Sequence, residues 1–220
     1  KPGVTTFAID KFVEQFIISH NAIPAQKGYH GYPYASCTSV NDEICHGMPS
    51  EYVLKEGDIV KVDMVADKDG WMADSAWCYA VGEVSPVAQK LMKVTKECLY
   101  KGISKAVEGN RLGDIGYHIQ RHAEKNGFSV VRDFTGHGIG RAMHEEPAIL
   151  HYGQIGRGLR IVEGMVFTVE PMINEGDYDL YINRDNGWTA YTSDGSLSAQ
   201  YEHTVAITAN GPEIMTKQEF

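Results

Sequence analysis

The sequence predicts a mixed α+β fold within a single domain. Amphipathic helical patterns and short β-rich runs alternate along the chain, and Gly and Asp turns separate them. The length of 220 residues suits one domain or two fused halves, and a hydrophobic fraction of 43% is enough for a sizeable core. We therefore expect one folded unit over residues 1–220, in which helices cover a β-sheet.

The first predicted helix lies near the amino terminus. Either Thr5 or Thr6 can cap its first turn, and the helix should end near Asn21. Apolar side chains recur every three or four residues in this segment, at Ile9, Phe12, Val13, Phe16 and Ile17. This spacing places them on one face, so the helix should pack that face against a sheet.

Two further helices are expected in the middle of the chain. One should start after Ser85-Pro86 and fade near Gly109, since proline is favoured in the first turn of a helix. The next should start near Leu112 and stop at Asn126-Gly127. Both carry apolar residues on a single face, which is typical of helices at the surface of a domain.

Short β-rich runs surround these helices, and two of them resemble each other. Strands are expected over residues 59–65, 166–169 and 203–207. The segments 56–64 and 163–172 both begin with Glu-Gly, continue into a Val-rich run and carry a carboxylate seven residues after the first glutamate. This repeat places Asp63 and Glu170 at equivalent positions and suggests two related halves, although Glu-Gly turns before Val-rich strands are also common by chance.

Composition and charge restrict the class of protein. Asp and Glu outnumber Lys and Arg by 29 to 20, and the resulting net charge of -9 disfavours binding to nucleic acid or to an anionic membrane. No segment is apolar enough to span a membrane, and no signal peptide is visible. The four cysteines lack the density of a disulfide scaffold and the spacing of a zinc knuckle. A reducing cytoplasm is the expected compartment.

Four carboxylates stand within or beside apolar, strand-like segments, at Asp63, Asp74, Glu170 and Glu202. A buried carboxylate without a partner is costly, and its pKa shifts until the group becomes neutral. Asp74 follows Asp63 across the turn at residues 68–70, a spacing typical of a hairpin that brings both onto one side of a sheet. Any one of them could pair with Lys or Arg, but four together favour bound metal ions.

Three of the nine histidines have settings that favour function. His137 lies in the run Gly-His-Gly-Ile-Gly, where the backbone can approach a ligand closely. His144 follows seven residues later, and His46 lies far upstream in Cys-His-Gly. These three are either one metal ligand and two substrate contacts or ordinary packing residues. The sequence gives no special setting to His20, His118, His122 and His151, and His203 should point away from Glu202 by strand alternation.

Other catalytic motifs are absent from the sequence. His144-Glu145 does not form a zinc-protease helix motif, because position 148 is Ala rather than His. The glycines after Gly136 do not complete a dinucleotide-binding motif, because Met143 stands at its last position. The sequence also has no nucleophile elbow and no phosphate-binding loop. An oxygen-rich set of four carboxylates and one imidazole suits two divalent ions better than one zinc ion.

These residues also carry a resemblance that covers nearly all of the chain. The sequence resembles the type I methionine aminopeptidases of the pita-bread metallohydrolases in segments 28–33, 45–47, 58–63 with Asp74, 136–141 with 144–147, 167–171 and 198–204. The resemblance implies a pita-bread fold, in which two pseudo-twofold halves form antiparallel sheet covered by helices. The Glu-Gly repeat agrees with such halves. Family members usually carry another amino-terminal helix, which we expect to be absent here.

The resemblance further implies a centre with two divalent ions, which would be Co, Mn, Fe or Zn. The implied ligands are Asp63, Asp74, His137, Glu170 and Glu202, with Asp74 and Glu202 bridging. Family members also hold an ion of the sodium or potassium type beside a loop that corresponds to Asn41, Glu43 and Ser198. Backbone carbonyls supply much of that second site, so the residue types support it less directly.

The implied reaction removes the initiator methionine from peptides and nascent proteins whose second residue is small. A water held by the two ions would attack the carbonyl carbon, and Glu170 would accept its proton. His144 would donate a hydrogen bond to the carbonyl oxygen, while His46 would hold the backbone of the next residue. Candidates for the methionine pocket are Tyr29, Tyr32, Cys37, Met143 and Trp188. Met143 replaces a phenylalanine that is common in the family, which leaves the fine shape of the pocket open.

Two other functions share this fold. A proline-directed peptidase would use the same metal ligands but would normally be longer and would lack the Cys-His-Gly setting of His46. A non-catalytic protein that binds peptide or nucleic acid would have lost metal ligands, whereas this chain keeps all five. We therefore expect a monomeric cytoplasmic enzyme that acts on peptides and on nascent chains at the ribosome, and that binds neither nucleic acid nor membranes.

Overall fold

The structure, a computed structural model, describes residues 1–218. It contains the helices α1 (Thr6–Ser19), α2 (Pro86–Ile103) and α3 (Leu112–Lys125). The strands are β1 (Ile23–Pro24), β2 (Cys37–Val40), β3 (Glu43–Cys45), β4 (Ile59–Lys68), β5 (Trp71–Ala80), β6 (Ser129–Val130), β7 (Gly136–Gly138), β8 (Glu145–Ile149), β9 (Val166–Val169), β10 (Met172–Asn174), β11 (Leu180–Ile182), β12 (Ala190–Thr192), β13 (Ser198–Gln200), β14 (His203–Thr208) and β15 (Gly211–Ile214). The mixed α+β prediction is confirmed.

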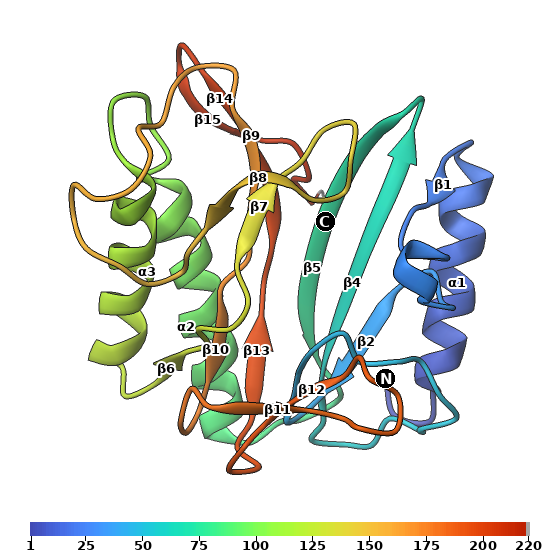
Figure 1. Ribbon diagram of the computed structural model, residues 1–220. Coiled ribbons are helices and arrows are strands. Elements are labelled where there is room, and N and C mark those ends of the chain that lie inside the picture. The colour runs from blue at the N-terminus through green and yellow to red at the C-terminus, as the bar shows by residue number, and fades with distance from the viewer. Residues whose placement is uncertain (219–220) are drawn as a thin grey trace.

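Most of the strands form two halves, and helices cover each half from outside (Figure 1), while β11, β12 and β3 pair in a separate three-stranded sheet. In one half, α1 lies against a sheet in which β4 pairs with β1, β2 and β5. In the other half, α2 and α3 pack on the strand sets β15-β14-β9-β7-β8 and β13-β10-β6. The pairings within these sheets are antiparallel. The three predicted strands are confirmed as β4, β9 and β14.

The Glu-Gly repeat is also a repeat in structure. The strands β4 and β9 begin two residues after Gly57 and Gly164, which both adopt a left-handed conformation with φ of 93° and 88°. Each of these glycines donates its N–H to a backbone carbonyl at the end of the neighbouring strand, at 2.9 Å in both cases. The two halves therefore deliver Asp63 on β4 and Glu170 just after β9 by equivalent turns.

Both ends of α1 lie close to the predicted positions. The helix begins after Thr5, whose Oγ1 accepts a hydrogen bond from the backbone N–H of Ala8 at 3.0 Å. This bond satisfies one of the amide groups that the first turn of a helix leaves without a partner. The helix ends at Ser19, two residues before Asn21, which turns the chain with a φ of 55°.

The face that α1 buries differs from the predicted apolar face. Val13 and Ile17 are buried against β2 and β4, but Phe12 and Phe16 are 67% and 53% exposed, so their predicted burial is wrong. Their rings instead lie beside each other on the surface, with centroids 6.0 Å apart. Asp10 takes part of the buried face because its carboxylate accepts hydrogen bonds from two backbone N–H groups of the loop before β2.

The helix α3 begins and ends as predicted, with Asn126 as its carboxy-terminal cap. By contrast, α2 ends at Ile103, so the predicted end near Gly109 is wrong. The chain turns back after α2, and the N–H of Gly109 donates to the carbonyl of Ile161 at 3.0 Å. Tertiary contacts can override a local apolar pattern, and the prediction of the helix end depended on such a pattern.

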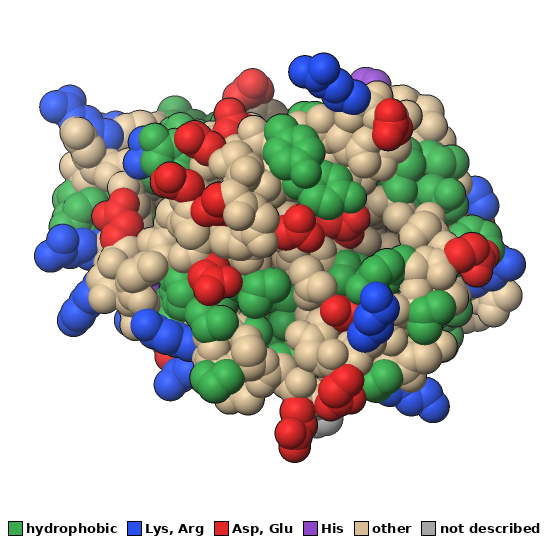
Figure 2. Space-filling model, turned by 90° about the horizontal axis from the view of Figure 1, so that it is seen from below, with side chains coloured by type: hydrophobic (Ala, Val, Ile, Leu, Met, Phe, Trp, Pro, Cys, Tyr) green, Lys and Arg blue, Asp and Glu red, His purple; other side chains and the backbone are tan. Residues whose placement is uncertain are grey.

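The surface reflects the acidic composition. Figure 2 shows the lower face of the molecule as it stands in Figure 1, where Asp and Glu side chains spread across the middle and most Lys and Arg side chains lie near the edges.

Within residues 1–218, no helix is both long and apolar enough to cross a membrane. The thiols of Cys37, Cys45, Cys78 and Cys98 are free and buried.

Candidate functional site

A cavity between the two halves collects all the predicted ligands of the divalent ions and all the predicted substrate contacts. Its volume is about 310 Å³. The predicted metal ligands in its wall are Asp63, Asp74, His137, Glu170 and Glu202. The predicted substrate contacts in its wall are Tyr29, Tyr32, Cys37, His46, Met143, His144 and Trp188. Segments that are far apart in sequence therefore meet in one place, and their individual roles remain proposals.

The β4–β5 hairpin brings two of the carboxylates onto one face, as the spacing predicts. Asp74 on β5 pairs with Val65 on β4, and Val65 lies two residues after Asp63. Because side chains alternate along a strand, Asp63, Val65 and Asp74 point to the same side of the sheet. The backbone of Asp74 is fixed by Thr204, whose Oγ1 accepts from the Asp74 N–H at 3.0 Å and donates to the Asp74 carbonyl at 2.9 Å.

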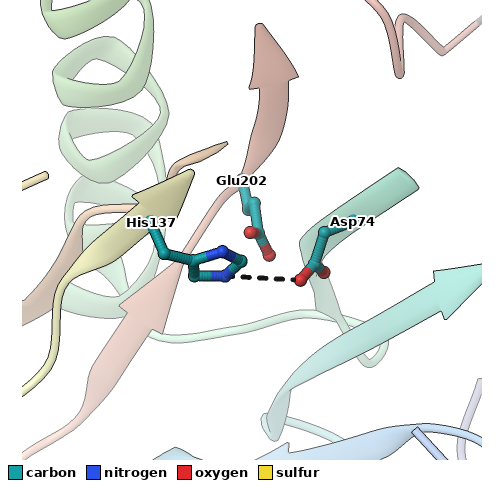
Figure 3. A group of neighbouring side chains, drawn as sticks. All are labelled: Asp74, His137 and Glu202. Atoms are coloured by element: carbon teal, nitrogen blue, oxygen red, sulfur yellow. Dashed lines mark ion pairs between the residues drawn. The ribbon is translucent and has the colours of Figure 1, made fainter. Parts of the chain in front are cut away.

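Three of the ligand candidates converge closely from different elements. Potential ligand atoms of Asp74, His137 and Glu202 all lie within 4.8 Å of one another. Figure 3 shows the three side chains pointing toward a common space, with the His137 ring directed at the Asp74 carboxylate. The Nε2 atom of His137 is 3.7 Å from Asp74 Oδ2 and 3.6 Å from Glu170 Oε1. This imidazole therefore stands between carboxylates of both halves.

The tautomer of His137 leaves its cavity-facing nitrogen free. The Nδ1 atom lies 2.9 Å from the carbonyl oxygen of Gly138, which can only accept a hydrogen bond. Nδ1 therefore carries the hydrogen, and the lone pair of Nε2 faces the carboxylates. Burial also lowers the pKa of His137, which favours this neutral form. A neutral imidazole held by a backbone carbonyl is the usual form of a metal-binding histidine.

The carboxylates repel one another when no cation is present. Burial raises the pKa of Asp63 to about 7 and that of Glu170 to about 8. Burial and the neighbouring carboxylates also raise the pKa of Asp74 and Glu202 well above the usual range. Within residues 1–218, Asp74 Oδ1 and Glu202 Oε1 are buried without a hydrogen-bond partner. Buried anionic oxygens in such a group fit divalent cations, which satisfy both the charge and the missing partners.

Several polar residues that orient these ligands were missed by the sequence analysis. Thr168 Oγ1 accepts from the His137 N–H at 3.0 Å and donates to Glu170 Oε1 at 2.8 Å, so one hydroxyl links two candidate ligands. Gln26 Nε2 donates to Asp63 Oδ1 at 3.2 Å, and Gln200 Nε2 donates to Glu170 Oε2 at 3.4 Å. Strand alternation carried a signal for Thr168, which stands two residues before Glu170.

His151 was also missed, and its assignment to the residues without a special setting is wrong. The side chain is fully buried, and its Nε2 accepts a hydrogen bond from the backbone N–H of Glu170 at 3.2 Å. Burial lowers the pKa of His151 to about 3, with repulsion from His137 as a smaller cause. The imidazole is thus neutral at physiological pH and holds the backbone of a ligand candidate. His203, by contrast, faces away from the cavity as predicted, toward Trp77 and Tyr100.

The histidines His46 and His144 stand in the cavity wall outside the cluster of ligand candidates. Tyr29 OH lies 2.7 Å from His144 Nδ1, and the His144 ring is in edge contact with His137 at 4.2 Å between centroids. His46 has a left-handed backbone with φ of 55°, which is unusual for a residue other than glycine and recurs at functional sites. Burial lowers the pKa of His46 to about 4, so this ring is also neutral near pH 7.

Apolar and sulfur-containing side chains form the rest of the wall. The rings of Tyr32 and Trp188 meet edge to face at 5.0 Å between centroids, and the buried side chains of Cys37 and Met143 also line the cavity. The sequence analysis missed the further wall residues Cys45, Phe134 and Met172. Cys45 stands beside His46 and Met172 two residues after Glu170, so their neighbours in sequence carried a signal, whereas Phe134 lies in a loop. Together these groups make a surface suited to an unbranched thioether side chain.

The three residues selected for a monovalent ion also lie together. Asn41, in the turn between β2 and β3, accepts a hydrogen bond at its carbonyl from the N–H of Ser198 at 3.0 Å. Glu43 lies at the start of β3, where its carboxylate accepts from Tyr191 OH at 2.9 Å. The buried side chain of Lys61 reaches into this group, and burial lowers the pKa of its amine.

Without metal, the folded chain should lose stability as the pH rises from about 6.5 to about 8.5. The raised pKa values of Asp63 and Glu170 mean that the folded state keeps protons which the unfolded state has released. The stability that these protons confer decreases as the pH rises and is lost once the pH has passed through about 7 to 8. His46 does not oppose the trend, because it is neutral in both states above about pH 7. Each retained proton changes stability by about 1.4 kcal/mol per pH unit.

Thermal unfolding of chelated protein at three pH values in this range measures the effect. The same protein saturated with Mn should show a smaller decline, since bound cations keep the carboxylates ionised in the folded state. A melting temperature of the metal-free protein that increased across this range would contradict the assignment of these carboxylates.

Comparisons with known proteins also indicate a metal-dependent peptidase. The model of metallopeptidase family M24 matches residues 1–209. A methionine aminopeptidase from Clostridium acetobutylicum is 53% identical over 217 residues, which cover 98% of this chain and 86% of that protein. The crystal structure of methionine aminopeptidase from Rickettsia prowazekii matches with a TM-score of 0.97 at 51% identity, and covers 99% of this chain and 88% of that chain.

A prolidase from Pyrococcus furiosus shares the fold alone. It matches with a TM-score of 0.75 at 22% identity, and the match covers all of this chain but only 58% of the prolidase chain. The close structural match to the Rickettsia enzyme confirms the predicted pita-bread fold, and the identity to both aminopeptidases confirms the predicted resemblance. The match over nearly the whole sequence means that this chain belongs to metallopeptidase family M24.

Proposed function

We propose that the chain is a metalloaminopeptidase that removes an amino-terminal methionine from peptides and nascent proteins whose second residue is small. One observation carries the proposal: a group of four carboxylates and one neutral imidazole faces an apolar, sulfur-containing wall across a single cavity. The close aminopeptidase relatives support the same reading. Such a cavity can hold divalent ions at one end and a methionine side chain at the other.

The five ligand candidates, Asp63, Asp74, His137, Glu170 and Glu202, would hold two divalent ions. When bound, such ions lower the pKa of a water molecule and polarise a carbonyl group. The oxygen-rich donor set with one imidazole favours Mn, Co or Fe over Zn. Glu170 is the proton acceptor in this proposal, because its carboxylate is held at both oxygens, by Thr168 and by Gln200.

His144 would donate a hydrogen bond to the oxygen of the scissile carbonyl as negative charge develops there. This role requires that the hydroxyl of Tyr29, which lies 2.7 Å from His144 Nδ1, donates its hydrogen to that nitrogen. A neutral imidazole with an acceptor at Nδ1 carries its hydrogen on Nε2, where it can serve a substrate. His46 would contact the backbone of the second residue of the substrate, from its place between Phe134 and Trp188.

The physiological substrates in this proposal are nascent chains at the ribosome in the cytoplasm. The whole of residues 1–220 would act as one catalytic domain and as a monomer. The net charge of -9 disfavours nucleic acid and anionic membranes as partners. Nascent proteins differ in their second residue. A size limit at that position would therefore determine which of them are substrates.

The protein should release methionine from a Met-Ala-Ser peptide at least about tenfold faster than from Met-Leu-Ser. The scissile bond has to come close to the ligand-bearing strands, and a branched second side chain would collide with them. Leu-Ala-Ser should also be a poor substrate, because the wall suits an unbranched thioether. Product release from the three peptides by Mn-loaded protein is followed by chromatography.

Equal turnover of Met-Ala-Ser and Met-Leu-Ser would contradict the proposed selectivity for a small second residue. An Ala-Pro dipeptide in the same assay tests the proline-directed alternative, which requires faster cleavage of Ala-Pro than of Met-Ala-Ser. A non-catalytic binding protein would release nothing from any of these peptides at any metal concentration.

A further inference from the structure

A buried lysine lies at the centre of the first half of the molecule. Lys61 is on β4, between Ser39 of β2 and Cys78 of β5, and only 1% of its surface is exposed. It is among the largest fully buried side chains in residues 1–218. A buried amine without acceptors is very costly, so a lysine in this position needs fixed partners.

The partners of Lys61 are two backbone carbonyl groups. Its Nζ donates to the carbonyl of Asn41 at 3.0 Å and to the carbonyl of Ser198 at 2.8 Å. Asn41 belongs to the turn after β2, whereas Ser198 is the first residue of β13 in the other half. One amine therefore connects three segments across the boundary between the halves.

Hydrogen bonds that do not involve Lys61 hold the carbonyl of Asn41 in place. Its backbone N–H donates to the carbonyl of Ile59 at 2.9 Å, and its side-chain Oδ1 accepts from the Ile59 N–H at 3.0 Å. Its Nδ2 also donates to Asp58 Oδ1 at 2.9 Å. With its backbone and side chain so restrained, Asn41 presents its carbonyl in a left-handed turn with φ of 50°. Such a rigid turn is suited to hold a positive charge.

Asn41 and Ser198 are two of the three residues, with Glu43, beside which the family resemblance implies a sodium- or potassium-type ion. Coordination of such an ion requires carbonyl oxygens that converge on an open space. Here the amine of Lys61 already lies between the carbonyl oxygens of Asn41 and Ser198 and donates a hydrogen bond to each. A second positive charge in the same place would be repelled. The residues present therefore do not fit the ion.

We infer that the ammonium group of Lys61 takes the place of a monovalent cation and serves as a covalently attached cation that joins the β2–β3 turn, β4 and β13. The negative charges of Glu43 and Asp42 act on the Lys61 amine against the effect of burial and favour its protonated form. Lys61 stands two residues before Asp63, and Ser198 stands four residues before Glu202. The fold around the candidate metal centre thus depends on no sodium or potassium ion.

Thermal unfolding of the Mn-loaded protein in KCl, NaCl and choline chloride at equal ionic strength tests the inference. The wild type should melt at the same temperature in all three salts. Lys61→Asn removes the amine and opens space between the carbonyls, so this variant should melt lower in choline chloride and recover by at least about 2 °C in KCl or NaCl. Lys61→Met fills the space without a charge, so it should be destabilised equally in all three salts.

Two results would overturn the inference. The first is a wild type that is stabilised by potassium or sodium relative to choline. The second is a Lys61→Asn variant that responds to these ions no more than the wild type does. If neither variant folds, wild-type crystals soaked in rubidium chloride decide the matter: an anomalous peak between the carbonyls of Asn41 and Ser198 contradicts the inference, and its absence there supports it.

Discussion

Removal of divalent metal should reduce methionine release from Met-Ala-Ser to the limit of detection. The buried carboxylates of the cavity repel one another without a cation, and none of the other side chains in its wall can polarise a carbonyl as strongly as a metal ion. Loss of ions that bind only the folded state should also lower stability, by about 2.7 kcal/mol where the ion had been present at a hundredfold excess over its Kd. For a chain of this size the melting temperature should fall by about 5 to 10 °C.

The experiment compares chelated and dialysed protein with the same sample after addition of Mn, Co, Fe or Zn. Mn, Co or Fe should restore turnover better than excess Zn, because the donor set contains one imidazole and four carboxylates. Metal content is measured on every sample. Full turnover by protein that is verified to be free of metal would rule out a metal-dependent reaction in this cavity.

Replacing His144 with alanine should lower kcat by about a hundredfold or more while the protein keeps its bound metal. The ring lies in the cavity wall outside the five ligand candidates, and a hydrogen bond donated by Tyr29 to its Nδ1 would leave a hydrogen on Nε2 for the substrate. One donor to a developing oxyanion is typically worth about 3 to 4 kcal/mol in the transition state. Steady-state kinetics and metal analysis of the same preparation measure the two quantities together.

The matched variant His137→Ala should lose metal affinity, because it removes the single imidazole of the ligand set. His118→Ala is the control for loss of a histidine in general, since this residue lies on α3 and bonds to the carbonyl of Asp114 outside the cavity. His118→Ala should leave both activity and metal content unchanged. If His144→Ala lost its metal while His137→Ala retained it, the proposed roles of the two residues would be wrong.

The positions of the ligand candidates were predictable because strong local patterns carry them. Asp63 and Glu170 follow Glu-Gly turns into Val-rich runs, and the positive φ of Gly57 and Gly164 gives these turns one shape. Asp74 follows from hairpin spacing, since a hairpin fixes which residues share a face. Turns and strand alternation act over a few residues, so the sequence displays them directly.

Features that depend on distant contacts were not predictable from such patterns. After α2 the chain turns back and Gly109 donates to the carbonyl of Ile161, and on α1 Asp10 takes part of the buried face because its carboxylate binds a loop. His151 has no pattern around it, yet it holds the backbone of Glu170. The amine of Lys61 bonds to a carbonyl of β13, far along the chain. Nearly every residue type offers the same backbone N–H and carbonyl groups, so the sequence does not show which of them will be hydrogen-bonded.

The division of the ligand candidates between two halves also determines when the centre can form. Asp63 and Asp74 emerge early in synthesis, but Glu202 lies just before β14, in the last part of the chain. Contacts between such distant segments form slowly, because a long loop has to close before they stabilise the chain. An incomplete chain therefore has only part of the donor set and would hold a metal ion weakly. In the proposed enzyme, tight metal capture would be the final step of folding and would report that the carboxy-terminal strands have docked.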